Sequence, residues 1–159
     1  VTVGNSCQVT DGAGAVLIMD EEKAKAMGYE PLGYIRAYTY IGLEPHKMGL
    51  GPAYAIPGVL KKAGLKLQDM DLVEINEAFA VQVLACIRAL ASKKFAQENF
   101  ASTEAIGQVD MEKLNVNGGA ISITSLWLFS VNRGSSEITP ENRLGAPSGI
   151  FSYTSRRLR

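Results

Sequence analysis

The chain has 159 residues, 47% of them hydrophobic and 20% charged, and its acidic and basic side chains balance to a net charge of +0. This length predicts one domain with a sizeable core, and the composition is that of an ordinary globular protein. The balanced charge gives no electrostatic case for nucleic-acid or membrane-surface binding, and no apolar run approaches the roughly 20 residues of a membrane-spanning helix.

The two cysteines, Cys7 and Cys86, lie far apart and have no metal-ligand spacing. Neither a disulfide framework nor a metal site is expected, and no secretory signal opens the chain. These features predict a reduced, cytoplasmic protein. The chain begins at Val1 without a methionine, so we expect it to be a piece of a longer chain.

The first third of the chain predicts a loop, a strand, a helix and a second strand. Residues 4–14 are rich in Gly, Asn and Ser, and the apolar run at 15–19 has the length of a strand. Asp20 is expected to cap a short exposed helix that Gly28 ends. Residues 34–41 alternate with period 2, which predicts a strand whose three tyrosines are half-buried.

The next predicted elements are a loop and an amphipathic helix. Residues 42–51 carry the only histidine, His46, and a lone loop histidine is more often solvated than catalytic. Pro52 suits the first position of a helix, and Gly64 suits its end. Pro57 should kink this helix or mark its true start.

Residues 71–91 predict a short strand that leads into a buried helix. Asn76 can act as the helix N-cap, and Glu77 in the first turn suits the positive end of the helix dipole. The helix is apolar nearly all round, which predicts burial. Ligands of open α/β sheets bind where strands hand over to helices, so Asn76 and Glu77 mark a candidate site.

The character of the sequence changes twice after this helix. Residues 92–113 are polar and mixed in charge, and residues 114–121 predict a strand edge followed by a Gly pair. Residues 1–121 contain nine Lys and two Arg, whereas residues 122–159 contain no Lys and five Arg. We therefore predict a domain at 1–121 and a divergent Arg/Ser-rich tail at 122–159, either frame-shifted or poorly ordered.

Four motifs in this order resemble the C-terminal half of the thiolase family, which makes or cleaves 3-oxoacyl-CoA. The motifs are Gly4-Asn5-Ser6 with Thr10-Asp11-Gly12-Ala13, Glu44-Pro45-His46-Lys47-Met48-Gly49-Leu50-Gly51-Pro52, Glu74-Ile75-Asn76-Glu77-Ala78-Phe79-Ala80 and Asn115-Val116-Asn117-Gly118-Gly119-Ala120-Ile121. The resemblance implies an α/β fold, namely the C-terminal βαβαβαββ half of a five-layered α-β-α-β-α architecture. The middle loop looks most like that of the fatty-acid oxidation thiolases.

The resemblance also implies site residues. Asn76 matches the asparagine that fixes the oxyanion-hole water, although its plain reading is a helix cap. Met48, Ala78 and Phe79 match positions that line the acyl and pantetheine pocket. Without the resemblance, these residue types would indicate core positions. Cys7 stands where many members have a CoA-contacting serine. No metal or cofactor is implied, because CoA thioesters are the substrates.

The departures from the family decide what the chain can do alone. In the family, Asn-Gly-Gly-Ala-Ile is soon followed by Gly-His-Pro and later by Cys-x-Gly, whereas here Ile121 is followed by Ser122-Ile123-Thr124. The nucleophilic cysteine, the Gly-His-Pro histidine and the second cysteine are therefore missing from this sequence. One hypothesis is a thiolase-type acyltransferase chain that is inactive alone. The alternative is a non-catalytic remnant or interaction module that binds CoA or a partner thiolase chain, with a homo-oligomer or a complementary chain as partner. A generic α/β domain is a third reading, which four ordered motifs disfavour.

Overall fold

The computed structural model describes residues 1–9, 15–122 and 149–152. Except for Ser122 and a short strand at 149–152, the predicted tail lies outside the described residues, as do residues 10–14 of the predicted first loop. The helices and strands are α1 Glu21–Ala26, α2 Gly51–Ala63, β1 Leu72–Ile75, α3 Ala80–Leu90, α4 Lys93–Phe100 and β2 Gly149–Ser152. Three 3-10 turns accompany them: η1 Val3–Asn5, η2 Pro45–Leu50 and η3 Leu67–Asp69.

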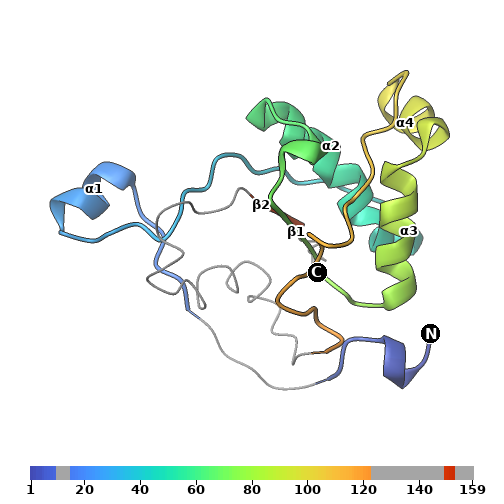
Figure 1. Ribbon diagram of the computed structural model, residues 1–159, viewed down its shortest axis with the longest axis horizontal. Helices are drawn as coiled ribbons and strands as arrows, with labels where there is room; N and C mark the ends of the chain where they lie inside the picture. Colours follow the sequence, from blue (N-terminus) through green and yellow to red (C-terminus); the bar gives the residue numbers. More distant parts are fainter. Residues whose placement is uncertain (10–14, 123–148, 153–159) are drawn as a thin grey trace.

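The core lies between β1 and the helices α2 and α3, which sit together at one end of the molecule (Figure 1). Ile75, Ile56 and Leu90, one from each of these elements, are all fully buried. Burial of such side chains contributes roughly 1.5–3 kcal/mol each, so this cluster is the main source of stability. The full cluster is Ala53, Ile56, Leu60, Leu67, Met70, Val73, Ile75, Val83, Cys86, Ile87, Leu90 and Val109.

Helix α2 forms as the sequence predicts. It begins at Gly51 with Pro52 in its first turn, and it ends at Gly64, which adopts the left-handed conformation with φ 70°. The Gly64 N–H donates to the carbonyls of Leu60 and Lys61, which satisfies two orphan acceptors of the last turn. Pro57 lies inside the helix and so does not mark its start.

Helix α3 corrects two expectations. It begins at Ala80 rather than after Asn76, and its N-cap position is Phe79, which makes no side-chain capping bond. The helix is buried on one face only: Cys86 and Leu90 are fully buried, whereas Val81 is 59% exposed and Leu84 is 48% exposed. The apolar composition therefore overstated the burial, because one face of α3 has no neighbouring layer among the described residues.

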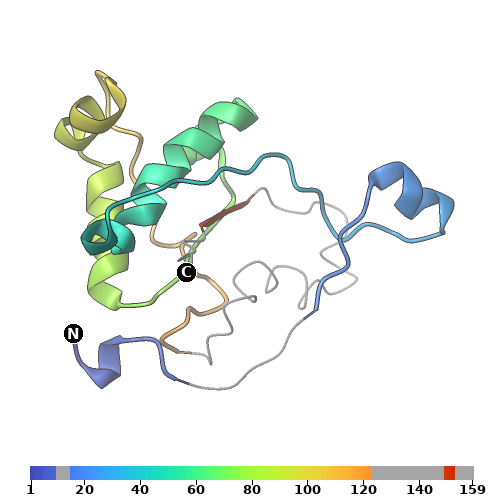
Figure 2. The same cartoon turned by 180° about the vertical axis from the view of Figure 1, so that it is seen from behind.

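The two predicted strands near the N-terminus are not strands in the structure. Residues 15–19 and 34–41 run as extended segments on either side of α1, which projects away from the core (Figures 1 and 2). Tyr34, Tyr38 and Tyr40 are 53%, 66% and 84% exposed, so the expected half-buried packing is wrong. An alternating pattern makes a strand only where a neighbouring strand supplies the ladder of hydrogen bonds.

Helix α1 itself follows local signals. The Asp20 carboxylate accepts from the Lys23 N–H at 3.1 Å, and Gly28 follows the helix with φ 75°. Both ends were predicted correctly because capping bonds join residues that are close in sequence.

Helix α4 was missed within the polar stretch 92–113. The Ser92 hydroxyl accepts from the Phe95 N–H at 3.2 Å and caps the helix. Phe95 and Phe100 then form an edge-to-face cluster with Tyr54 of α2. The serine cap was the one local signal for this helix, and the aromatic packing that holds it involves a residue far away in sequence.

Candidate functional site

The candidate site is the corner between β1 and α3, residues 76–79. Asn76 follows directly after β1 and is half-buried. Within the described part of the chain, no hydrogen bond engages its side-chain amide, so the amide can bind an oxygen atom from elsewhere. Asn76 is thus not the helix cap that its position suggested.

Glu77 is held by the loop that contains the Asn-Gly-Gly motif. Its carboxylate accepts from the Asn115 Nδ2 at 2.8 Å and from the Ile121 backbone N–H at 3.2 Å. Hydrogen bonds to an ionised carboxylate are stronger than neutral ones. Glu77 therefore ties the corner to residues 115–121 and does not serve the first turn of α3.

Asn115 continues the sheet with its side chain. The Ile75 N–H donates to Asn115 Oδ1 at 2.9 Å, and Asn115 Nδ2 donates back to the Ile75 carbonyl at 3.0 Å. The side-chain amide thus makes the two hydrogen bonds to Ile75 that the backbone of a neighbouring strand would otherwise make. Asn115 adopts φ 49°, a left-handed conformation that Asn tolerates better than most residues.

Gly119 permits the close approach of this loop to Glu77. A Cβ atom built at Gly119 would overlap the Glu77 carboxylate. The Gly pair thus lets the backbone come close to a side chain of this same chain.

Two of the segments predicted to bind substrate meet at the corner. The Cys7 N–H donates to the Ala78 carbonyl at 3.0 Å, and Ser6 forms an antiparallel bridge with Phe79. Cys7 and Ala78 are half-buried, and the Phe79 side chain is 38% exposed. The structure therefore brings Cys7, Ala78 and Phe79 next to Asn76.

Met48 lies outside this corner, on η2. Its side chain is 49% exposed, and η2 packs against α3. The Cys86 thiol of α3 donates to the Gly49 carbonyl at 3.3 Å, which fixes η2 on that helix. Met48 therefore lies on a different element from the other predicted residues, and α3 is the element that connects η2 with the corner.

The Cys86 thiol is structural. The side chain is fully buried, and burial raises the pKa of the thiol, although a hydrogen bond from Gln82 acts in the opposite direction. A raised pKa leaves little thiolate at neutral pH, and the thiolate is the nucleophilic form. Cys86 is therefore a small core residue.

His46 is solvated, as a lone loop histidine usually is. Its side chain is 72% exposed, and its Nε2 lies 3.4 Å from a carboxylate oxygen of Glu44. Lys47 also contacts Glu44 at 2.8 Å, and this hydrogen bond raises the pKa of Lys47. The three residues form an exposed cluster on η2, separate from Asn76.

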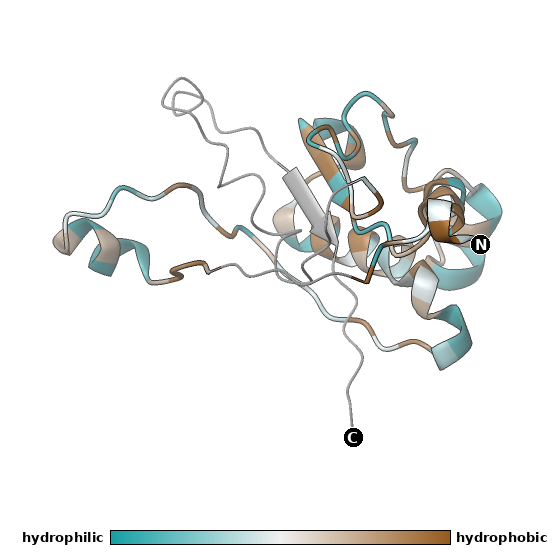
Figure 3. Cartoon of the chain, turned by 90° about the horizontal axis from the view of Figure 1, so that it is seen from below, coloured by the Kyte–Doolittle hydropathy of each residue, from teal (hydrophilic) through white to brown (hydrophobic). Residues whose placement is uncertain are grey.

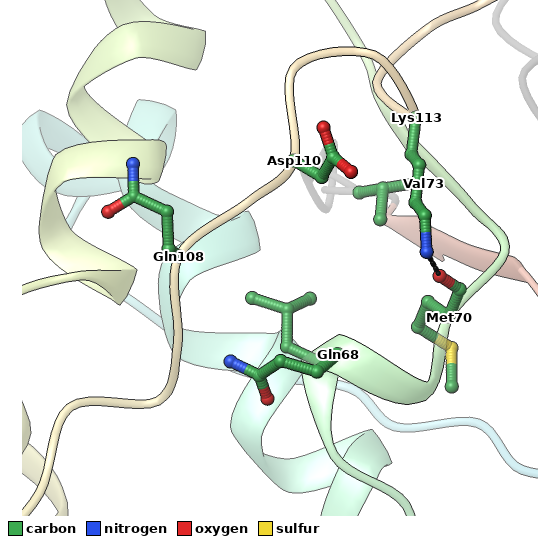
Figure 4. A pocket seen from close by; sticks show the side chains of 7 residues that line it. Gln68, Met70, Val73, Gln108, Asp110 and Lys113 are labelled. Carbon is green, nitrogen blue, oxygen red and sulfur yellow. Dashed lines mark hydrogen bonds between the residues drawn. The ribbon is translucent and has the colours of Figure 1, made fainter.

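A pocket of about 130 Å³ lies between η3 and the segment 108–113, with Val73 of β1 in its lining (Figure 4). Within it, Lys113 Nζ donates to the Met70 carbonyl at 2.9 Å. The pocket does not include the strand-to-helix corner. Across the described residues, no group of His, Cys, Asp and Glu side chains is arranged to hold a metal ion, and no helix could span a membrane.

Comparison with known proteins gives one family. The family model "Thiolase, C-terminal domain" matches residues 29–125. A 3-ketoacyl-CoA thiolase of Shewanella loihica is 50% identical over 123 residues, which are 77% of this chain and 28% of that protein. The chain thus spans about 28% of the length of the curated relatives that it matches.

Solved structures agree with this assignment. The crystal structure of human mitochondrial 3-ketoacyl-CoA thiolase is 47% identical with a TM-score of 0.60, over 76% of this chain and 26% of that one. The dimeric peroxisomal thiolase of Saccharomyces cerevisiae is 41% identical with a TM-score of 0.61, over the same shares. The α/β arrangement described above is therefore a thiolase-like fold of the C-terminal half, and the chain belongs to the thiolase family.

Proposed function

We propose that this chain is part of an acyltransferase that converts a 3-oxoacyl-CoA and CoA into acetyl-CoA and a shortened acyl-CoA, as in fatty-acid oxidation. The observation that carries the proposal is the corner in which Cys7 bonds to Ala78 beside Asn76. The relatives named as 3-ketoacyl-CoA thiolases support the reaction class. The acyl chain is carried by CoA, and no cofactor is needed.

In this proposal Asn76 holds a water molecule that donates to the thioester or enolate oxygen. Its half-buried amide has the donors that this task requires, and such a donor is worth roughly 3–4 kcal/mol in the transition state. Cys7, Ala78 and Phe79 would contact the acyl and pantetheine chain beside it, and Met48 would contribute from η2.

The chain alone is proposed to be inactive. Cys86 is a buried thiol with a raised pKa, and the solvated His46 lies against Glu44 on η2, away from the corner. A covalent acyl-enzyme needs a reactive thiolate beside a base. These residues do not form such a pair.

A thiolysis assay tests this directly. Purified chain is given acetoacetyl-CoA and CoA, and the loss of acetoacetyl-CoA is followed by absorbance. We expect a rate equal to that of buffer alone, because neither Cys7 nor Cys86 is paired with a base among the described residues. Turnover above that rate, which persists after a second purification step, would contradict the inactivity.

Calorimetry with CoA tests the role of Asn76. We expect weak binding by the unchanged chain and a several-fold weaker affinity for Asn76→Ala, because a polar contact near the thiol end of CoA is lost. Asn99→Ala is the matched control, since Asn99 lies on α4 and its Nδ2 donates to the Phe95 carbonyl. Equal affinity for all three proteins would remove Asn76 from the site, and absence of binding would remove the site itself.

The cytoplasm is the location that we propose, on the ground of the two free thiols and no disulfide between them. We also propose that residues 1–121 form the thiolase domain and that residues 122–159 come from a shifted reading frame. The coding DNA decides the second point: a shift of one or two bases near codon 121 should restore a Gly-His-Pro motif. No such motif in either other frame would overturn it.

The exposed apolar segments favour a second candidate function, an interaction module. Hydrophobic side chains lie open to solvent along the two extended segments and on the outer face of α3. The brown stretches of the ribbon in Figure 3 mark hydrophobic residues. Patches beyond a few hundred Å² usually mark interfaces. The exposed residues are Val16, Leu17, Ile18, Ile35, Tyr38, Tyr40, Val81 and Leu84. Val83 and Ile87 of α3 are not part of this surface, because they are buried in the chain's own core.

Light scattering at a series of dilutions tests this candidate. We expect a mass above that of one chain, because association would bury these side chains at roughly 25 cal/mol per Å². The partner would be a second copy or a complementary thiolase chain. A monomer that persists from low to high concentration would contradict self-association.

A further inference from the structure

Both edges of β1 are occupied. In a parallel ladder, the N–H and C=O groups of alternate residues point to opposite edges. The Val73 N–H donates to the Lys113 carbonyl, and the Val73 carbonyl accepts from the Asn115 N–H, each at 2.9 Å. One edge of β1 therefore faces residues 113–115. The backbone N–H and C=O groups of Leu72 and Glu74 point to the other edge, where β2 lies parallel to β1.

The chain order assigns a different strand to that second edge. The alternating segment 34–41 is followed by α2 and then by β1, which is the order of a strand, a crossover helix and a parallel strand. Such a unit places its two strands in one sheet, usually as neighbours. With β2 in place, no edge of β1 remains for 34–41.

Segment 34–41 lies instead over α2, close to the sheet. Lys62 Nζ of α2 donates to the Tyr38 carbonyl at 3.0 Å, and the Thr39 side chain lies against Gly58 of the same helix. β2 also contacts α2. Figures 1 and 2 show the segment running along α2 in both views. Ile35 and Tyr40 remain 68% and 84% exposed.

We propose that segment 34–41 and β2 compete for the same edge of β1, so that the tail acts as a built-in strand that displaces 34–41. When β2 leaves this edge, segment 34–41 pairs with β1, and the side chains at alternate positions of the segment become buried. When β2 binds, 34–41 is released with its apolar side chains exposed. Segment 34–41 is already held on α2 by the contacts of Tyr38 and Thr39, which keeps it a competitor for this edge of β1.

The test places proline in β2 of the full chain. With Leu72 opposite Gly149 and Glu74 opposite Phe151, the N–H groups that face β1 are those of Ile150 and Ser152. Ile150→Pro removes one of these donors, whereas Phe151→Pro removes an N–H that points away from β1, which makes it the matched control. Hydrogen–deuterium exchange is measured on peptides that cover 34–41, at two protein concentrations.

We expect residues 34–41 to exchange at least tenfold more slowly in Ile150→Pro than in Phe151→Pro or the unchanged chain. Equal exchange in the two proline variants would overturn the proposal. Slower exchange only at the higher concentration would mean pairing between copies and would overturn it as well.

A reciprocal variant covers the case in which Ile150→Pro loses its far-UV helix signal. Tyr38→Pro/Thr39→Pro blocks segment 34–41 as a strand in either orientation. The amides of Ile150 and Ser152 should then exchange at least threefold more slowly, because their competitor is gone. An unchanged exchange rate at both amides would overturn the proposal.

Discussion

Replacement of Asn115 by alanine should lower the free energy of unfolding by about 3 kcal/mol. The change removes three hydrogen bonds, two to the Ile75 backbone and one to Glu77. Ile75 is 1% exposed, and a buried backbone group left without a partner costs about 1–3 kcal/mol. Alanine at φ 49° adds strain of about 1 kcal/mol. Urea denaturation followed by circular dichroism measures the loss.

Two variants separate the causes. Asn115→Gly relieves the backbone strain but not the lost bonds, so it should be destabilised less than Asn115→Ala. Asn99→Ala removes one exposed bond to the Phe95 carbonyl and should cost less than about 0.5 kcal/mol. A loss below about 1 kcal/mol for Asn115→Ala would mean that the amide does not act as a substitute strand.

Replacement of Gly119 by alanine should cost about 2 kcal/mol. The new Cβ would overlap the Glu77 carboxylate, which must then move away from Asn115 or from the Ile121 N–H. Overpacking of this kind typically costs 1–3 kcal/mol. The same urea titration measures it, and Gly42→Ala is the control because nothing lies within 4 Å of a Cβ at Gly42.

A double-variant cycle identifies Glu77 as the cause. Glu77→Ala alone loses both hydrogen bonds of the carboxylate. Once the carboxylate is gone, Gly119→Ala should add almost nothing, so the two losses should be strongly non-additive. Additive losses would show that the Cβ at position 119 clashes with something other than Glu77.

The corner at residues 76–79 shows how far the sequence reaches into the site. The resemblance implied that Met48, Ala78 and Phe79 line the acyl pocket and that Cys7 stands at a CoA contact. The structure joins Cys7 to Ala78 but leaves Met48 on η2. The sequence did not predict the role of Glu77. A carboxylate after a strand suits a helix N-terminus, and its actual partners lie some forty residues away in the chain.

Elements whose hydrogen bonds are local were determined by the sequence. Helix α1 is delimited by Asp20 and Gly28, and α2 ends at Gly64, because each of these caps bonds to residues within one turn. Pro52 marks the first turn of α2 through its fixed φ and not through a hydrogen bond. The family was likewise determined by the sequence alone, since four motifs in order need no coordinates.

The tertiary structure alone decided where the sheet ends and which segments join it. Residues 34–41 have the pattern of a strand, yet β2 takes the edge of β1, and the Asn115 side chain takes the place of a strand beside Ile75. A strand edge offers a fixed number of donors and acceptors, and segments distant in sequence compete for them. The outcome depends on the whole chain, so no local pattern determines it.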